Sequence, residues 1–301
     1  MKLLVTGGTG LIGSAIENVD IRLGSKDADL KSWEQTNKIF KSSKPTHVIH
    51  CAARVGGLGG NISAKGEYYY DNIMMNTNVI EACRVHGVKN LICFLSTCVF
   101  PDDAEYPLTE DMMHLGEPHN SNFGYAYAKR MADVQIRAYK EQYGLNYLSV
   151  IPCGAYGPND NFNLKSGHVI PSLIHKCHIA KETNTEFEVW GTGRPLREFL
   201  YSKDIGKMCS YLIENHNDTD PIILTSGIEY SIKEIVGLIV DTMEFKGAVK
   251  WLADKPDGQF RKPASNKRLK SILPNFEFTP IEVGISETVD WFNKNYPKAR
   301  K

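Results

Sequence analysis

The sequence has no excess of either charge and no long basic run. Its 301 residues carry 35 Lys and Arg against 35 Asp and Glu, so the formal net charge is zero. Nucleic-acid binding depends on clustered basic residues that neutralise phosphates. We therefore expect no DNA or RNA partner.

Long apolar runs are also missing, and none reaches the ~20 residues that a membrane-spanning helix needs. The first residues, MKLLVTGG, are typical of a buried strand and lack the apolar core and cleavage site of a signal peptide. The seven cysteines are odd in number and show no paired spacing, which favours reduced thiols over a disulfide framework. We expect a cytoplasmic protein with no membrane partner.

Metal-binding motifs such as CxxC and HExxH are absent, so no metal site is expected. The chain instead alternates apolar runs with helical patterns. The strand-like runs are residues 2–6, 46–53, 90–97 and 145–152. Helical periodicity occupies residues 71–86 and 125–143, and each of these stretches is followed by glycine. This alternation predicts an α/β fold with a Rossmann-type, doubly wound parallel sheet.

The amino-acid composition of the chain changes after the fourth strand. The loops GPNDNFNLKSGH and WGTGRPLREF are polar and rich in glycine, and residues 231–243 and 281–292 form amphipathic helical patterns. We expect a nucleotide-binding domain over residues 1–157, with a strand and helix returning to it near residues 198–216. A smaller α/β substrate-binding lobe, partly interleaved, should cover residues 158–301. The active cleft is expected between the two, outside the carboxyl ends of the strands.

The stretch GGTGLIG follows the first strand and opens a helix. Glycine at this spacing permits a tight turn and lets backbone amides approach a pyrophosphate at the helix N-terminus. The context of strand, loop and helix therefore predicts dinucleotide binding rather than a simple turn. The expected cofactor contacts are Gly7, Gly8, Thr9, Gly10, Leu11, Ile12 and Gly13.

The second strand, near residues 21–25, bears on which dinucleotide binds. NAD-binding proteins usually place an acid there to hold the ribose hydroxyls. Here the strand ends in Ser25 and Lys26, a hydroxyl and a cation that suit the 2′-phosphate of NADP. We expect NADP(H); the alternative is that Lys26 is a solvated lysine at a strand end.

Tyr125 and Lys129 have the Y-x-x-x-K spacing that puts two side chains on one helix face. An ammonium beside a phenol should lower the tyrosine pKa and make it a usable proton donor. Lysine can also hold the nicotinamide ribose, and Ser96, at the end of the third strand, could bind the same carbonyl oxygen. Tyr127 is a rival for the tyrosine role, but it has no lysine four residues further on.

The glycine loop, the serine and the Y-x-x-x-K pair resemble the extended short-chain dehydrogenase/reductase superfamily. Further motifs narrow the resemblance to the GDP-L-fucose synthase family, also called GDP-4-keto-6-deoxy-mannose epimerase/reductases. These motifs are HCAARVGGLGGN, LSTCVFP, PHNSNFGYAYAKRM, GHVIP, VWGTG-x-P-x-REF and DGQFRK. The resemblance runs almost end to end. It implies NADP(H), a GDP-4-keto-6-deoxy-D-mannose substrate, and a homodimer in which the helices of residues 71–86 and 125–143 form a four-helix bundle.

In that family one site epimerises carbons 3 and 5 of the sugar and then reduces the 4-keto group. Both carbons lie alpha to the carbonyl, so polarising its oxygen with Ser96 and Tyr125 makes their protons acidic. By resemblance, Cys98 is the base and His168 the acid. Because Ser96 and Cys98 are two residues apart on a predicted strand, they should point to the same side.

A cysteine taken alone is more often a packing residue. We assign packing roles to Cys51, Cys93 and Cys153, which lie in apolar runs, and a lone histidine would be a loop or capping residue by default. The resemblance implies more cofactor contacts: Ala52, Ala53, Lys129, Pro152, Cys153, Gly154, Ala155 and His168. The implied substrate contacts are Asn122, Lys176, Trp190, Arg197 and Asp257, with Arg261 and Lys262 as further candidates. Any of these could instead be a surface charge or a core side chain.

Two stretches depart from the family pattern. The family usually has P-T-N after the fourth strand, where the asparagine helps to hold the cofactor. Here Pro152, Cys153 and Gly154 occupy that stretch, so a cofactor contact must come from backbone. The region after Gly13 is also shortened, which leaves the adenine end of the cofactor site the least defined.

Two other functions remain open. Another NAD(P)-dependent nucleotide-sugar epimerase or dehydratase would retain and regenerate its cofactor, and it would lack the S-x-C and GHVIP pair. A non-catalytic NADP-binding regulator would be expected to lose part of the Ser-Tyr-Lys triad, and all three residues are present.

Overall fold

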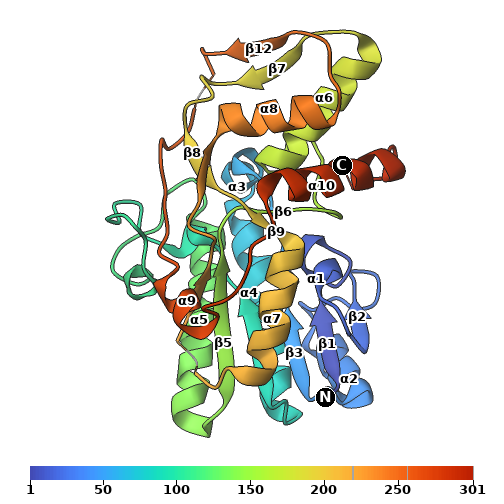
Figure 1. The fold of residues 1–301 in the computed structure, drawn as a ribbon. Helices are drawn as coiled ribbons and strands as arrows, with labels where there is room; N and C mark the ends of the chain where they lie inside the picture. Colours follow the sequence, from blue (N-terminus) through green and yellow to red (C-terminus); the bar gives the residue numbers. More distant parts are fainter. Residues whose placement is uncertain (219, 256, 301) are drawn as a thin grey trace.

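The computed structural model describes residues 1–218, 220–255 and 257–300. A parallel sheet of six strands forms the larger part, in the order β10-β5-β4-β3-β1-β2 (Figure 1). The chain adds β2 on one side of β1 and β3 on the other, so the topological switch point lies at the ends of β1 and β3. The strands are β1 (Leu3–Thr6), β2 (Ile21–Leu23), β3 (His47–His50), β4 (Asn90–Phe94), β5 (Asn146–Pro152) and β10 (Ile222–Leu224). The predicted fold class is confirmed.

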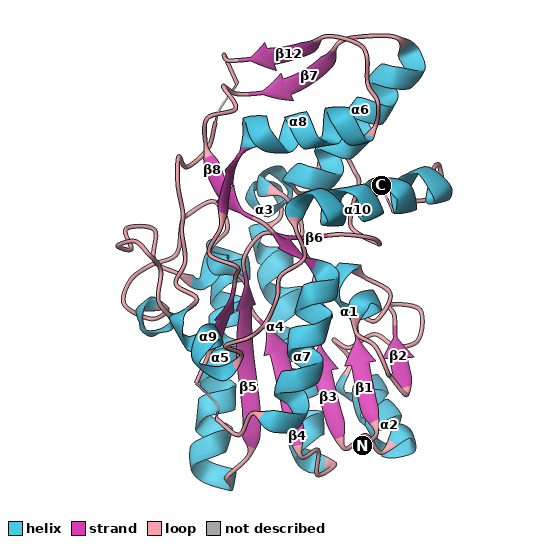
Figure 2. Cartoon of the chain, viewed as in Figure 1, coloured by secondary structure: helices cyan, strands magenta, loops and turns pink. Residues whose placement is uncertain are grey.

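Helices cover both faces of the sheet, as Figure 2 shows. Because side chains alternate along a strand, Leu4 of β1 packs into the core of one face while Leu3 and Val5 pack into the other. The first face carries α2 (Trp33–Ser43), α4 (Lys65–Val85) and α5 (Phe123–Tyr143), and the second carries α1 (Leu11–Ala15), α7 (Ser202–Asn215) and α9 (Lys267–Ile272). A short helix, α3 (Leu58–Ser63), precedes α4.

The smaller lobe has a hydrophobic core of its own. A capping box, in which the side chains of Ser231 and Glu234 each accept the other's backbone N–H, starts its helix α8. The helices of this lobe are α6 (Val169–Thr183), α8 (Ile232–Thr242) and α10 (Ile281–Asn295). Its strands pair as β7 (Phe187–Trp190) with β12 (Val249–Leu252), and as β8 (Leu196–Glu198) with β11 (Glu229–Ser231). β6 (Ala155–Tyr156) and β9 (Leu200–Tyr201) pair where the chain passes between the lobes.

The observed boundaries differ from the predicted ones near the cleft. The runs at residues 46–53 and 90–97 end as strands at His50 and Phe94, because the loops that follow turn to line the cleft. Helix α4 begins at Lys65, six residues before the predicted stretch, and β10 was not predicted. No helix in the described part of the chain is long and apolar enough to cross a membrane.

Candidate active site

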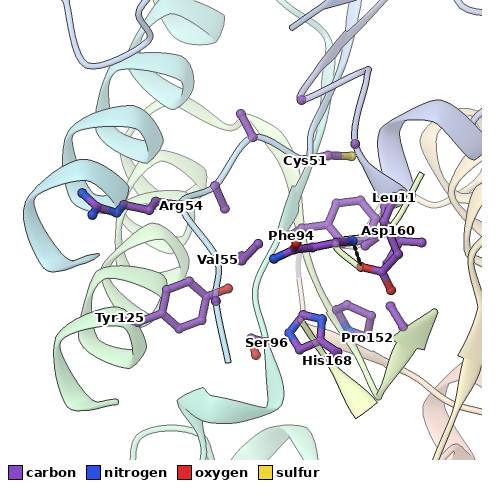
Figure 3. A pocket seen from close by; sticks show the side chains of 18 of the residues that line it. Leu11, Cys51, Arg54, Val55, Phe94, Ser96, Tyr125, Pro152, Asp160 and His168 are labelled. Carbon is purple, nitrogen blue, oxygen red and sulfur yellow. Dashed lines mark hydrogen bonds between the residues drawn. The ribbon is translucent and has the colours of Figure 1, made fainter. Parts of the chain in front are cut away.

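A cavity of about 1330 Å³ opens at the carboxyl ends of the sheet strands, between the glycine loop and the smaller lobe. Pockets for a single small ligand usually measure roughly 300–1,000 Å³, so this one has room for a cofactor and a substrate together. Figure 3 shows Tyr125 and Asp160 on different sides of it, with His168 between them in that view. Ser96 lies at its floor, where β4 ends.

The glycine loop is packed so closely that side chains are excluded at two positions. Gly7 has a φ of +65°, and a Cβ there would lie 2.7 Å from the backbone nitrogen of Ala52. A Cβ at Gly13 would lie 2.3 Å from the carbonyl oxygen of Gly7. The loop residues that line the cavity are Gly7, Thr9, Gly10, Leu11, Ile12 and Gly13, whereas Gly8 donates its N–H to Leu23 instead. This bare backbone fits a dinucleotide pyrophosphate.

At the adenine end, Ser25 lines the cavity, while Lys26 is exposed and lies outside the lining. Two lining cations pair with the Asp71 carboxylate: the Lys31 Nζ at 3.3 Å and the Arg54 guanidinium at 2.8 Å. Arg22 accounts for the shortened region, because its guanidinium donates to the carbonyl oxygens of Gly13 and Ile16 and so braces the five-residue helix α1.

The Ser96–Cys98 segment is a turn and not the end of a strand, so the expectation of strand alternation was wrong. Ser96 is extended, and its Oγ accepts the backbone N–H of Cys98 at 3.4 Å, capping a 3₁₀ turn over Thr97–Val99. The turn still brings both Ser96 and Cys98 to the cavity. Asn122 lies outside the lining, but its Nδ2 donates to the Cys98 sulfur at 3.0 Å.

Tyr125 and Lys129 both line the cavity, and Tyr127 is not among its lining residues. Lys129 is 1% exposed; its Nζ donates to the carbonyl oxygen of Phe94 at 2.8 Å and lies 5.9 Å from the centre of the Tyr125 ring. Burial raises the pKa of Tyr125, the neighbouring Cys98 raises it further, and the Ser96 hydroxyl opposes the rise. The predicted lowering by Lys129 is therefore not what the structure shows. The phenol keeps its proton at neutral pH, as a proton donor must.

His168 directly precedes α6 and is exposed towards the open cavity, where its side chain makes no helix-capping bond. The surrounding walls of the cavity lower the pKa of His168, and the positive charge of Arg300 lowers it further. The imidazole is therefore mainly neutral at neutral pH. It faces the same space as Ser96, Cys98 and Tyr125.

Asp160 is a cavity residue that the sequence patterns did not single out. It is 3% exposed; one carboxyl oxygen accepts the backbone N–H of Asn161 at 2.7 Å, and Oδ2 is buried with no hydrogen-bond partner. Burial raises the pKa of Asp160 to about 7. The only sign of Asp160 in the sequence was an acid inside the polar loop GPNDNF. Arg300 lies near Asp160 and His168, and it belongs to no sequence motif.

The predicted substrate residues divide into two groups. Arg197 lines the cavity, and burial lowers its pKa while the charge of Asp257 partly offsets the effect. Lys176, Trp190 and Asp257 lie outside the lining. The Nζ of Lys176 sits 5.0 Å from the centre of the Trp190 ring, and Asp257 accepts the N–H and hydroxyl of Thr192 at 2.6 and 2.7 Å.

The two adjacent cations after β12 face different ways. Arg261 is exposed, outside the lining, and bound to Glu229 with N–O distances of 2.7 and 3.0 Å. Lys262 lines the cavity, and its Nζ donates to the carbonyl oxygen of Thr97 at 3.2 Å.

All seven cysteines lie in the described residues, and each carries a free thiol. Cys93 and Cys153 are buried in the core of one sheet face, while Cys51 is half-buried against the other. Burial raises the pKa of all three thiols. In the part of the chain that the structure describes, no group of three or more His, Cys, Asp or Glu side chains is arranged to hold a metal ion.

Residues 3–224 match the model of the NAD dependent epimerase/dehydratase family. The chain is also 48% identical to the GDP-L-fucose synthase of Dictyostelium discoideum, over 99% of this chain and 97% of that protein. The chain belongs to this family, among its GDP-L-fucose synthases. The matched region ends at Leu224, the last residue of β10, and so spans the whole parallel sheet.

More distant relatives and solved structures agree with this assignment. The GDP-L-fucose synthase of Escherichia coli strain K12 is 31% identical over 99% of this chain and 98% of its own length. A crystal structure of a GDP-L-fucose synthetase from Naegleria fowleri bound to NADP superposes with a TM-score of 0.94. That protein is 44% identical, over 99% of this chain and 94% of its own. NADP(H) is accordingly the cofactor of this family member.

At Gly154, where the resemblance implies an asparagine, the structure leaves no room for a side chain. Gly154 has a φ of +48°, and a Cβ there would lie 2.0 Å from the carbonyl oxygen of Glu198. Leu200 also donates its N–H to the carbonyl of Gly154 at 3.1 Å. The chain returning from the smaller lobe therefore occupies the space that a side chain at Gly154 would need, and this wall of the cavity is backbone.

Proposed function

We propose that this family member is a bifunctional epimerase/reductase that converts GDP-4-keto-6-deoxy-D-mannose to GDP-L-fucose with NADPH. One observation carries the proposal. A single cavity holds a glycine loop and a Ser-Tyr-Lys set, and it also holds a thiol and an imidazole. A reductase needs only the first two, so the extra pair supports epimerisation in the same place.

In the reduction, Ser96 and Tyr125 would bind the 4-keto oxygen. The buried phenol of Tyr125 gives its proton to that oxygen as the alcohol forms. Bound NADPH supplies the hydride to carbon 4. Lys129 is held by the carbonyl of Phe94, so its ammonium is fixed beside Tyr125.

In the epimerisation, the Cys98 thiolate would remove the proton from carbon 3 or carbon 5. The negative charge passes to the 4-keto oxygen, where Ser96 and Tyr125 stabilise it. His168 then returns a proton to the opposite face of the carbon. Because burial and Arg300 lower its pKa, the imidazole needs a negative charge nearby to carry that proton. The negative charge of a bound ligand near the imidazole would raise the His168 pKa.

The GDP end of the substrate would bind at the cavity mouth. Arg197 and Lys176 offer cations for the diphosphate, and the exposed ring of Trp190 offers an apolar surface. Asp257 holds the loop at Thr192 beside them. Asn122 serves the same site indirectly by holding Cys98. We place the cofactor in the domain of residues 1–157 with its return near 198–216, and the substrate in the lobe of residues 158–301.

The protein would act as a homodimer through α4 and α5, which pack side by side and together could supply half of a four-helix bundle. Several of their apolar side chains are exposed, which supports a covered surface. These are Tyr69, Tyr70 and Val85 on α4, and Phe123, Met131, Val134 and Tyr143 on α5. A cytoplasmic location would keep Cys98 and the other six thiols reduced.

The test is NADPH consumption with GDP-4-keto-6-deoxy-D-mannose. The proposal predicts one NADPH oxidised for each GDP-L-fucose formed. An epimerase or dehydratase that regenerates its cofactor would give product with no net loss of NADPH, and a regulator would bind NADPH without turnover. Either result would overturn the proposed function.

A further inference from the structure

Lys262 reaches from the segment after β12 into the turn that carries the reactive groups. Its Nζ donates to the carbonyl oxygen of Thr97, the residue between Ser96 and Cys98, at 3.2 Å. Among the described residues, the other donor to that oxygen is the backbone N–H of Phe100, which is farther away at 3.5 Å. The ammonium is thus the closer donor to this carbonyl.

The segment around Lys262 is fixed, so the contact is built into the fold. Leu108 forms a β-bridge with Ala264, donating its N–H to Pro263 at 2.9 Å and accepting from Ser265 at 2.8 Å. The N–H of Ala264 also donates to the buried carboxylate of Glu198 at 3.1 Å. Lys262 therefore points at Thr97 from a rigid backbone.

The Thr97–Cys98 peptide group connects this cation to the chemistry. Its carbonyl accepts from Lys262, and its N–H, on Cys98, donates to the Ser96 Oγ at 3.4 Å. Ser96 and Tyr125 line the same cavity. A cation that polarises a peptide carbonyl makes the N–H of the same peptide a better donor, and hydrogen bonds in such a chain strengthen one another.

We propose that Lys262 is a positioning residue for both half-reactions, holding and polarising the Thr97–Cys98 peptide so that Ser96 and Cys98 keep their reactive geometry. It acts through that peptide and not by binding the diphosphate. The inference rests on the proposed function, because it deepens the account of the same site.

The experiment compares Lys262→Met, Lys262→Gln and Lys262→Arg with wild type. Lys267→Met is the matched control, because Lys267 is exposed and lies outside the cavity lining. For Lys262→Met we expect a loss of about tenfold in kcat, the scale of one charge-assisted hydrogen bond, with KM for the sugar nucleotide changed less than about twofold. Deuterium uptake from heavy water at carbons 3 and 5, measured without NADPH, should slow in parallel. Lys262→Arg should recover most of the rate, since a guanidinium can also donate to Thr97.

Three results would overturn the inference. KM could rise with kcat unchanged, which would make Lys262 a diphosphate ligand. Lys262→Met could match Lys267→Met in every constant. Lys262→Gln, which keeps a donor but no charge, could lower the melting temperature together with the activity, and Lys262→Arg could restore neither. The role of Lys262 would then be structural. A wild-type protein that does not oxidise NADPH would instead refute the proposed function.

Discussion

Burial of the Asp160 carboxyl makes the stability of the folded protein depend on pH. The carboxyl is nearly inaccessible, and one of its oxygens has no partner. Burial raises its pKa from 3.8 to about 7, so the folded protein holds this proton more tightly than the unfolded chain does. Stability is therefore highest where the carboxyl is protonated in both states. It falls as the pH rises from the unfolded value towards the folded one.

Asp160→Asn should remove this pH dependence. The stability gained by the variant should grow from about pH 4 to pH 7 and then level off, at no more than about 4 kcal/mol. Urea unfolding at pH 5, 7 and 8.5 measures it for both proteins. A difference that is the same at all three pH values would mean that Asp160 is ionised throughout.

Gly154 provides a test of the backbone wall. Gly154→Asn restores the residue that the family usually has there, but its Cβ would meet the carbonyl of Glu198. We expect a loss of about 1–3 kcal/mol in unfolding free energy, typical of overpacking, and no gain in NADPH affinity. Gly87→Asn is the matched control, because Gly87 has a φ of +68° and open space around it. Equal stability of the two variants, with tighter NADPH binding by the first, would contradict this account.

Sequence patterns predict some of the site residues but not others. Tyr125 and Lys129 are four positions apart on one helix, so spacing alone could pair them. Asp160 has no such neighbour, because its environment comes from packing between segments. Lys262 was foreseen only as a candidate substrate contact, since its contact with Thr97 joins residues 165 positions apart.

Among the helices and strands, α4 and α5 are the elements that support a dimer. They pack against each other while exposing apolar side chains such as Tyr70 at 58% and Met131 at 37%. The two helices were predicted from periodicity, but periodicity in one chain cannot show which exposed face a second copy covers. The turn at Ser96–Cys98 was missed for a different reason. An apolar run continues into it, and only the Ser96 cap shows where the strand ends.

Met131→Glu should convert the dimer to monomers, because it places a charge within the apolar surface of α5. Light scattering after size exclusion gives the mass directly. Val283→Glu on α10 is the control, since Val283 is exposed by a similar 45% and lies on the smaller lobe. It should leave the dimer intact. A monomeric wild type, or a Met131→Glu variant that stays dimeric, would exclude this interface.

For the whole molecule, the fold class followed from the alternation of strands and helices, since a parallel sheet buried on both faces leaves that pattern. The last strand, β10, could not be predicted from this alternation, because it is three residues long and follows a long segment that forms the smaller lobe. The cavity depends on that segment. The sheet edge supplies the glycine loop and the reactive turn, while the returning chain supplies Arg197 and the backbone that fills the space beside Gly154.

In the proposed function, one cavity performs both epimerisation and reduction, with Cys98 as the base. The most direct test follows GDP-4-keto-6-deoxy-D-mannose by proton NMR in heavy water with NADPH, for wild type and for Cys98→Ser. Wild type should yield GDP-L-fucose carrying deuterium at carbons 3 and 5. The variant should lose this exchange by a factor of at least about 100, the scale of general-base catalysis, while still reducing the ketone. If the variant exchanges those protons as fast as wild type, Cys98 is not the base.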